Sequence, residues 1–130
     1  TIEDWLEANP TRLNEVLSRN PSYIFFDLRD ADATGPLGSL NVPLTARRSI
    51  AVDRRVIPLG APVWLQTTLP NEQQTPLNQL MLAQDTGGAI KGNVRADVFW
   101  GRGDEAEKLA GAMKQQGQLF VLLPKGYPVE

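Results

Sequence analysis

Residues 80–100 read LMLAQDTGGAIKGNVRADVFW, two β-like runs around a glycine-rich loop. Residues 80–84 and 96–100 carry many apolar and aromatic side chains and predict two short strands. The loop between them has three glycines in six positions, which permit backbone conformations closed to other residues and close approach of a ligand. Asp85 and Asp97 flank this loop at the strand ends. The stretch therefore indicates a β-rich fold with a candidate site between two strands.

Short β-like runs separated by glycine and proline continue on both sides of this stretch. Further strands are expected at residues 23–28, 47–52, 62–69 and 118–123. Six short strands predict a small β-barrel. The polar residues 70–78 are expected to form an exposed hairpin loop without chemical importance. One helix interrupts the strands, with Asp104 and Glu107 as its predicted capping pair and Gly117 as its C-terminal stop.

The start of the chain has helical patterning. Thr1 and Asp4 match a capping box for a first helix. Pro10 suits the first position of a second helix, with Asn9 as its predicted N-cap. These signals predict two short helices that are broken between Asn9 and Pro10.

The change in patterning predicts two parts, a helical segment at residues 1–20 and a barrel domain at 21–130. Aromatic side chains near this boundary are expected in the core, namely Trp5, Tyr23, Phe25 and Phe26. Trp64, Phe99 and Trp100 have flat apolar faces that suit a sugar ring, but core packing is the better interpretation for them.

Composition narrows the chemistry. The chain has 130 residues, no Cys and no His, which excludes a disulfide frame, a thiolate nucleophile, an imidazole base and Cys or His metal ligands. Chemistry must come from 15 Asp and Glu, 13 Lys and Arg, hydroxyls, amides or the backbone, and we expect no metal and no cofactor. A formal net charge of −2 disfavours a nucleic-acid partner. No apolar run predicts a membrane span, and the start at Thr1 predicts an excised or processed piece.

The aspartates each have a functional and a structural interpretation. Asp97 lies in an aromatic-rich strand, where partial desolvation would favour the protonated form that a general acid needs, whereas nearby Lys91 and Arg95 would oppose that effect. Asp85 is either a site residue or an Asx-turn residue that fixes the loop. Asp53 precedes two arginines and is expected to be ion-paired and structural. A phosphate-binding loop is the rival interpretation, but the glycine spacing does not match that motif.

Several ordered blocks together resemble one family. They are GSLNVPLT at 38–45, SIAVD at 49–53, IPLG at 57–60, AQDTGGAIKG at 83–92 and RADVFWG at 95–101, preceded by a similar approach at 20–26. These blocks resemble the membrane-bound lytic murein transglycosylase A family over nearly the whole chain. The three aspartates of that family's C-terminal domain correspond here to Asp53, Asp85 and Asp97. The resemblance implies a mainly β fold, a six-stranded double-psi β-barrel with short flanking helices.

The resemblance also implies an activity. It implies non-hydrolytic cleavage of the β-1,4 bond between N-acetylmuramic acid and N-acetylglucosamine in peptidoglycan, which leaves 1,6-anhydromuramyl ends. By motif matching, Asp97 corresponds to the general acid and base, Asp85 to the neighbouring catalytic aspartate and Asp53 to a supporting residue. Further substrate contacts are expected at Thr45, Gly87, Gly88 and Lys91. The implied location is the periplasmic face of the outer membrane of a Gram-negative bacterium, as a lipoprotein.

Members of this family are considerably longer than 130 residues. The expected partners are peptidoglycan glycan strands and the missing N-terminal part of the same protein, as a separate chain. An alternative is a non-catalytic glycan-binding barrel fragment, and a third interpretation is a purely structural half of a barrel. A missing strand would leave an open sheet edge that invites pairing with another chain.

Overall fold

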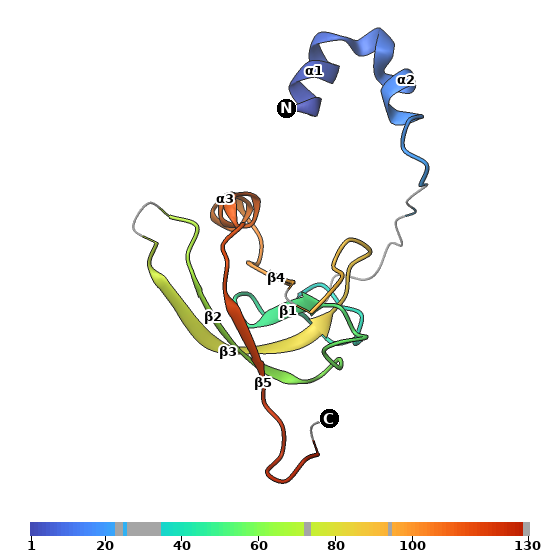
Figure 1. The fold of residues 1–130 in the computed structure, drawn as a ribbon. Coiled ribbons are helices and arrows are strands. Elements are labelled where there is room, and N and C mark those ends of the chain that lie inside the picture. Colours follow the sequence, from blue (N-terminus) through green and yellow to red (C-terminus); the bar gives the residue numbers. More distant parts are fainter. Residues whose placement is uncertain (23–24, 26–34, 72–73, 94, 129–130) are drawn as a thin grey trace. The chain divides into compact units, whose positions relative to one another are not determined.

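A strongly curled β-sheet dominates the computed structural model, which describes residues 1–22, 25, 35–71, 74–93 and 95–128 (Figure 1). The chain divides into two compact units, Thr1–Asp30 and Ala31–Glu130, and each is described by itself. The described part is mainly β, as predicted. No helix in the described ranges is both long enough and apolar enough to cross a bilayer.

The first unit contains three short helical elements, which are α1 (Ile2–Ala8), the 3-10 turn η1 (Pro10–Arg12) and α2 (Leu13–Leu17). The predicted capping box is confirmed, because the Asp4 amide donates to the Thr1 hydroxyl at 3.2 Å and the Asp4 carboxylate accepts from the Thr1 amine at 2.6 Å. The N-cap prediction for Asn9 is right in position but wrong in its hydrogen bond: Asn9 precedes Pro10 at the start of η1 and makes no side-chain capping bond there. Its side chain donates instead to the Trp5 carbonyl at 2.8 Å and so belongs to the end of α1.

The prediction of a core around the N-terminal aromatic residues is also wrong where it can be compared. Trp5 is 40% exposed and carries the Arg12 guanidinium over its ring at 5.2 Å. Phe25 is 88% exposed. Tyr23 and Phe26 lie outside the described residues. None of the residues in the three helical elements is buried, so amphipathic spacing alone predicted a core that these elements do not form.

Five strands form the sheet of the second unit. They are β1 (Ser49–Val52), β2 (Pro62–Thr68), β3 (Pro76–Asp85), β4 (Ala96–Val98) and β5 (Gln118–Val121). The sixth predicted strand, 23–28, lies outside the described residues except for Phe25. The predicted loop at 70–78 is shorter than expected, because β3 begins at Pro76 and pairs from there with β2. The polar residues Asn78 and Gln79 therefore belong to a strand.

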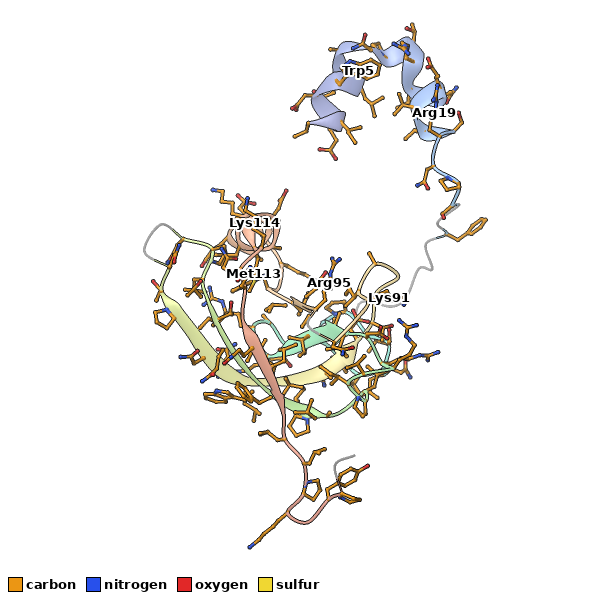
Figure 2. The ribbon with its side chains drawn as sticks, viewed as in Figure 1. Trp5, Arg19, Lys91, Arg95, Met113 and Lys114 are labelled. Atoms are coloured by element: carbon orange, nitrogen blue, oxygen red, sulfur yellow. The ribbon has the colours of Figure 1, made fainter. Side chains whose placement is uncertain are left out.

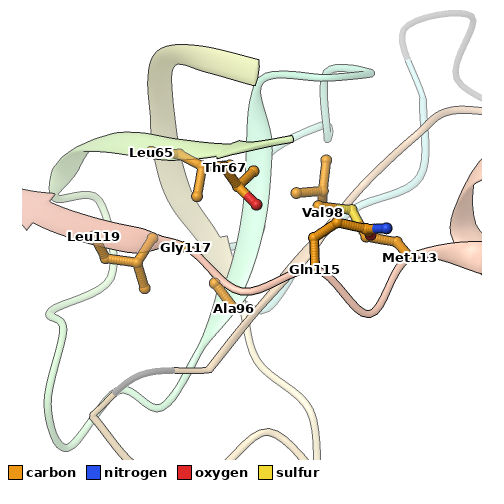
Figure 3. Close-up of a pocket in the computed structure, with 8 residues that line it drawn as sticks. All are labelled: Leu65, Thr67, Ala96, Val98, Met113, Gln115, Gly117 and Leu119. Atoms are coloured by element: carbon orange, nitrogen blue, oxygen red, sulfur yellow. The ribbon is translucent and has the colours of Figure 1, made fainter. Parts of the chain in front are cut away.

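The strand order across the sheet is β4-β1-β3-β2-β5. β1 and β3 are parallel, whereas the pairs β1–β4, β2–β3 and β2–β5 are antiparallel. The two edge strands, β4 and β5, both line one small inner cavity (Figure 3). The cavity measures about 60 Å³, and its lining residues are Leu65, Thr67, Ala96, Val98, Met113, Gln115, Gly117 and Leu119. The sheet therefore curls until its opposite edges approach the same space.

The two faces of the sheet differ in what covers them. The inner face carries the core, whose buried members are Ile50, Val52, Ile57, Val63, Leu65, Met81 and Ala83. On the other face Trp64 lies opposite both Leu80 and Phe120, and Leu82 lies opposite Pro62. The large apolar side chains here are 36–47% exposed, and we call them the outer apolar face: Trp64, Leu80, Leu82, Phe120 and Leu122.

The helix of this unit is α3 (Asp104–Ala112). Its predicted capping is wrong, because the helix begins after Gly103 with no side-chain cap and ends at Met113. Gly117 lies beyond that end and has a different role. A Cβ atom there would meet the Gln66 carbonyl oxygen at 2.6 Å, so glycine allows the approach to β5 to pass close to β2.

Candidate active site

Asp85 and Asp97 flank the same residue of β1. Ala51 pairs with Asp85 in the parallel ladder to β3 and with Asp97 in the antiparallel ladder to β4. Residues paired across neighbouring strands project to the same face of a sheet. Two strand spacings place the two α-carbons about 9–10 Å apart. The sheet thus brings together two carboxylates that are separated by a glycine-rich loop in the sequence.

A β-bulge makes this arrangement possible. Ile50 pairs with Ala83, but the register then shifts, so that Ala51 pairs with Asp85 rather than with Gln84. A one-residue shift of register exchanges the two faces of a strand. The bulge therefore turns Asp85 to the face that Asp97 occupies.

Both aspartates line one cavity of about 250 Å³, which we call the aspartate cavity. Its other lining residues come from β1, from the start of the glycine loop and from two neighbouring segments: Leu44, Ser49, Ile50, Ala51, Thr86, Ile90, Val98 and Phe99. Most of these side chains are apolar, so the two carboxylates are the charged groups of a recess that otherwise has two hydroxyls, those of Ser49 and Thr86, among apolar side chains. Recesses of this composition commonly bind small molecules or parts of polymers.

Asp85 is held on one side by Ser39. The Ser39 amide and the Ser39 hydroxyl both donate to Oδ1 of Asp85, each at 2.9 Å. The Ser39 hydroxyl also contacts the Thr86 hydroxyl at 2.7 Å. Ser39 belongs to the 38–45 block but carried no functional prediction, because its contact with Asp85 spans 46 residues and no local pattern reveals it.

Asp97 lies at the open side of this cavity. Its side chain is 52% exposed, so it is only partly removed from solvent. Arg95 lies beside it and donates from Nε to Oδ1 at 3.3 Å, as the sequence suggested for a nearby cation. Lys91, labelled with Arg95 in Figure 2, is exposed and forms no ion pair or hydrogen bond within the described ranges. Arg95 rather than Lys91 therefore sets the charge next to Asp97.

The glycine loop differs in part from its prediction. Among its three glycines, Gly92 alone has a positive φ, +96°, so the expected special backbone conformation is wrong for Gly87 and Gly88. Gly87 lies against the Ile90 side chain, where a Cβ atom would come within 2.8 Å. Gly88 is exposed, and a Cβ atom placed on it would have no neighbouring atom within 4 Å. Gly88 thus leaves open space beside the backbone.

Asp53 lies at the end of β1 and is buried. Its carboxylate accepts from Nε and Nη2 of Arg55 at 3.0 and 2.6 Å and from the Gly92 amide at 3.0 Å. The hydrogen bonds from the Arg55 guanidinium, the Gly92 amide and the Arg55 amide stabilise the carboxylate and hold the pKa of Asp53 far below its ordinary value. These contacts join β1 to the far end of the glycine loop, and Asp53 does not line the aspartate cavity. This geometry is that of a carboxylate that supports a loop.

A second network fixes Thr45 near the cavity. The Thr45 amide donates to the Ser49 hydroxyl at 2.8 Å, and that hydroxyl donates to the Gln84 side-chain oxygen at 2.5 Å. Ser49 is fully buried and lines the cavity, whereas Thr45 is exposed. The bulged residue Gln84 is therefore tied to the loop that precedes β1. Ser49 and Gln84 had no predicted role, because their hydrogen bond joins residues 35 positions apart and leaves no local sequence pattern.

The three aromatic residues whose flat faces could suit a sugar ring, Trp64, Phe99 and Trp100, lie in three different places. Trp100 is 6% exposed, which confirms core packing, and the Arg47 guanidinium lies over its ring at 5.5 Å. Phe99 lines the aspartate cavity. Trp64 lies on the outer apolar face instead. In the described part of the chain, no three His, Cys, Asp or Glu side chains gather in a way that could hold a metal ion.

Comparisons with known proteins agree with this architecture. Residues 48–123 match the family model described as 3D domain, and this span includes all three aspartates. The chain belongs to the 3D domain family. Within it, the relatives place the chain with the membrane-bound lytic murein transglycosylases A.

Three similar proteins illustrate that placement. Membrane-bound lytic murein transglycosylase A of Vibrio cholerae is 34% identical over 99% of this chain and 36% of its own length. The crystal structure of MltA from Neisseria gonorrhoeae, monoclinic form, is 49% identical with a TM-score of 0.82, over 98% of this chain and 32% of that one. E. coli MltA with bound chitohexaose is 33% identical with a TM-score of 0.77, over 92% and 37%. The chain thus spans about a third of the length of these relatives.

Proposed function

We propose that this chain is the catalytic part of a peptidoglycan lytic transglycosylase, with Asp97 as general acid and base. The observation that carries the proposal is the shared pairing of Asp85 and Asp97 with Ala51, which brings both carboxylates into one cavity. The names of the relatives and the chitohexaose complex of the E. coli protein support a β-linked glycan as substrate.

The first step is acid catalysis by Asp97. Its protonated carboxyl donates a proton to the glycosidic oxygen between N-acetylmuramic acid and N-acetylglucosamine. The bond from C1 of the muramyl ring to this oxygen breaks, the glucosamine leaves with the new hydroxyl, and positive charge develops on the muramyl ring. Arg95, 3.3 Å from Oδ1, stabilises the carboxylate that Asp97 becomes.

The second step closes the muramyl ring on itself. The C6 hydroxyl of the muramyl residue attacks C1, and the Asp97 carboxylate takes the hydroxyl proton, which restores the acid form. Because the nucleophile belongs to the substrate, no second carboxylate has to attack and no water is consumed. The negative charge of Asp85 is well placed to stabilise the developing positive charge. The product is a 1,6-anhydromuramyl end.

The remaining predicted residues serve as substrate contacts in this proposal. Gly88 leaves open space beside its backbone, where a sugar amide can approach closely. Gly87 follows the cavity residue Thr86 directly. Thr45 presents an exposed hydroxyl next to the buried Ser49 network. Asp53 keeps a supporting role at the loop. Lys91 completes the set as an exposed cation in the same loop.

The wider context is part of the same proposal. A six-stranded double-psi barrel over residues 21–130, preceded by the helical segment 1–20, is the fold that we propose. The approach of both edge strands to one inner cavity supports such closure. The proposed location is the periplasmic face of the outer membrane, anchored as a lipoprotein, which the membrane-bound name of the relatives supports.

The test is cleavage of purified glycan strands, with the product ends identified by mass spectrometry. We expect 1,6-anhydromuramyl ends from the parent chain. Asp97→Asn should lower the cleavage rate roughly 100-fold or more, because general acid catalysis contributes rate factors of this order. Asp104→Asn, which removes an exposed carboxylate at the start of α3, is the matched control and should cleave like the parent.

Two other outcomes have clear meanings. Reducing ends from the parent would show hydrolysis and overturn the single-carboxylate mechanism. Glycan binding without cleavage, by both parent and Asp97→Asn, would instead support a non-catalytic glycan-binding domain.

A further inference from the structure

Residues 35–45 fold back over the end of β3. Leu37 and Pro43 form an isolated antiparallel bridge within this segment. The Leu40 amide donates to the Gln84 carbonyl at 3.0 Å and so attaches the segment to the bulged end of β3. The segment therefore has a backbone structure of its own and a defined contact next to Asp85.

Gly38 shows how closely this segment approaches the strand. A Cβ atom at this position would lie 2.5 Å from the Gln84 carbonyl oxygen and 2.6 Å from the Leu44 side chain. Distances this short do not occur between real atoms, and the Gln84 oxygen is a backbone atom that cannot move aside. The segment can take this position because residue 38 is glycine, and this position puts Ser39 next to Asp85.

The hydrogen bonds of Ser39 have a defined direction. A carboxylate only accepts, so the single hydroxyl proton of Ser39 points to Asp85, and the Thr86 hydroxyl must donate to Ser39. Thr86, Ser39 and Asp85 thus form a chain of hydrogen bonds in which each strengthens the next. The amide of Ser39 adds a second bond to the same oxygen, Oδ1. Oδ2 of Asp85 accepts no hydrogen bond within the described ranges.

We propose that Ser39 is a positioning residue for the reaction, which fixes the Asp85 carboxylate through Oδ1 so that Oδ2 faces the substrate. The inference rests on the proposed function for its catalytic consequence, but its geometry is independent of that function. Two donors from one residue restrict rotation of the carboxylate, and a restricted carboxylate stabilises developing charge without reorganising. Ser39 itself does not line the aspartate cavity, whereas Asp85 and Thr86 do.

Kinetics on the full chain test the consequence. We expect Ser39→Ala to lower kcat about 10- to 100-fold with little change in KM, because a small misplacement of a catalytic group has effects of this size. Ser39→Thr keeps the hydroxyl at an exposed position and should restore most of the rate. Ser18→Ala, which removes a hydroxyl that donates to the Glu15 carbonyl, is the matched control.

A double variant separates positioning from a general effect on folding. If Ser39 acts through Asp85, adding Ser39→Ala to Asp85→Asn should cause no further loss, since the group that Ser39 orients has already changed. The proposal would be overturned if the double variant lost activity by the product of the two single losses, or if Ser39→Thr did not restore kcat.

A measurement without turnover keeps this inference apart from the proposed function. In nitrogen-15 spectra of the full chain, the Ser39 amide signal should move on Asp85→Asn and stay in place on Asp97→Asn. An unmoved Ser39 signal in Asp85→Asn would overturn the positioning role whatever the activity. If the Ser39 signal moves but the parent chain cleaves no glycan, the contact between Ser39 and Asp85 is supported and the proposed function is rejected.

Discussion

At the scale of single residues, the three aspartates occupy three different environments. Asp53 is buried and bonded to Arg55 and Gly92, Asp85 is held by Ser39, and Asp97 is half exposed beside Arg95. One residue type therefore fills a supporting position, a constrained position and an accessible one. The accessible aspartate is the one that can exchange protons with a substrate most directly.

The environment of Asp53 predicts a pH dependence of stability. Its pKa is lowered in the folded state, so its contribution to stability is complete above the unfolded value of about 3.9 and is lost as the pH falls toward the folded value. We expect the melting temperature to fall below about pH 4 in the parent, and to fall less steeply in Asp53→Asn, which is less stable at neutral pH.

Arg55 and Arg54 provide the matched controls for that experiment. Arg55→Gln removes the ion pair and should lower the melting temperature at pH 7 and flatten its dependence on acid, whereas the exposed Arg54 has no bond to Asp53 and Arg54→Gln should do neither. Equal acid dependence in the parent and Asp53→Asn would contradict the structural role of this carboxylate.

At the scale of helices and strands, the sequence predicted those features that depend on neighbouring residues in the chain. The capping box at Thr1 and strands β1, β2, β4 and β5 were predicted within a few residues, because their signals lie in adjacent side chains. The early start of β3 was missed, since Asn78 and Gln79 look like loop residues and become a strand by pairing with β2. The bulge that aligns Asp85 with Ala51 depends on contacts distant in sequence and has no local signal.

Two glycines of the second unit should respond to the same substitution in opposite directions. Gly117→Ala would place its Cβ 2.6 Å from the Gln66 carbonyl oxygen and should destabilise the chain by about 1–3 kcal/mol. Gly111 lies within α3 with nothing near its Cβ position, so Gly111→Ala should stabilise the helix by about 0.5 kcal/mol. Urea denaturation of both variants measures these changes. A tolerated Gly117→Ala would mean that β5 can move away from β2.

At the scale of the sheet as a whole, one face carries the core and the other carries exposed apolar side chains. The sequence did not predict this, because Leu80, Leu82 and Phe120 have the same residue types as core positions, and burial depends on which face the register selects. A contiguous exposed apolar surface is uncommon on a soluble protein and usually marks an interaction surface.

The outer apolar face predicts binding of a fluorescent apolar dye by the native chain. Combining Leu82→Gln with Phe120→Gln should reduce the dye signal roughly twofold and leave the melting temperature nearly unchanged, because both side chains are already 38% and 46% exposed. Leu13→Gln, at a comparably exposed leucine of α2, is the control. An unchanged dye signal in the double variant would mean that this face is already covered in solution, for which the solution mass gives a direct check.

The position of Ala51 between the two aspartates has a consequence for labelling. Ala51 lines the aspartate cavity, and the chain contains no cysteine. Ala51 is only 9% exposed, so Ala51→Cys would create a single thiol in the cavity wall between the two carboxylates, which a small alkylating reagent would reach through the cavity. A glycan seated over Asp85 and Asp97 would shield that thiol, so the rate of alkylation would report occupancy of the cavity even in a variant that cannot cleave.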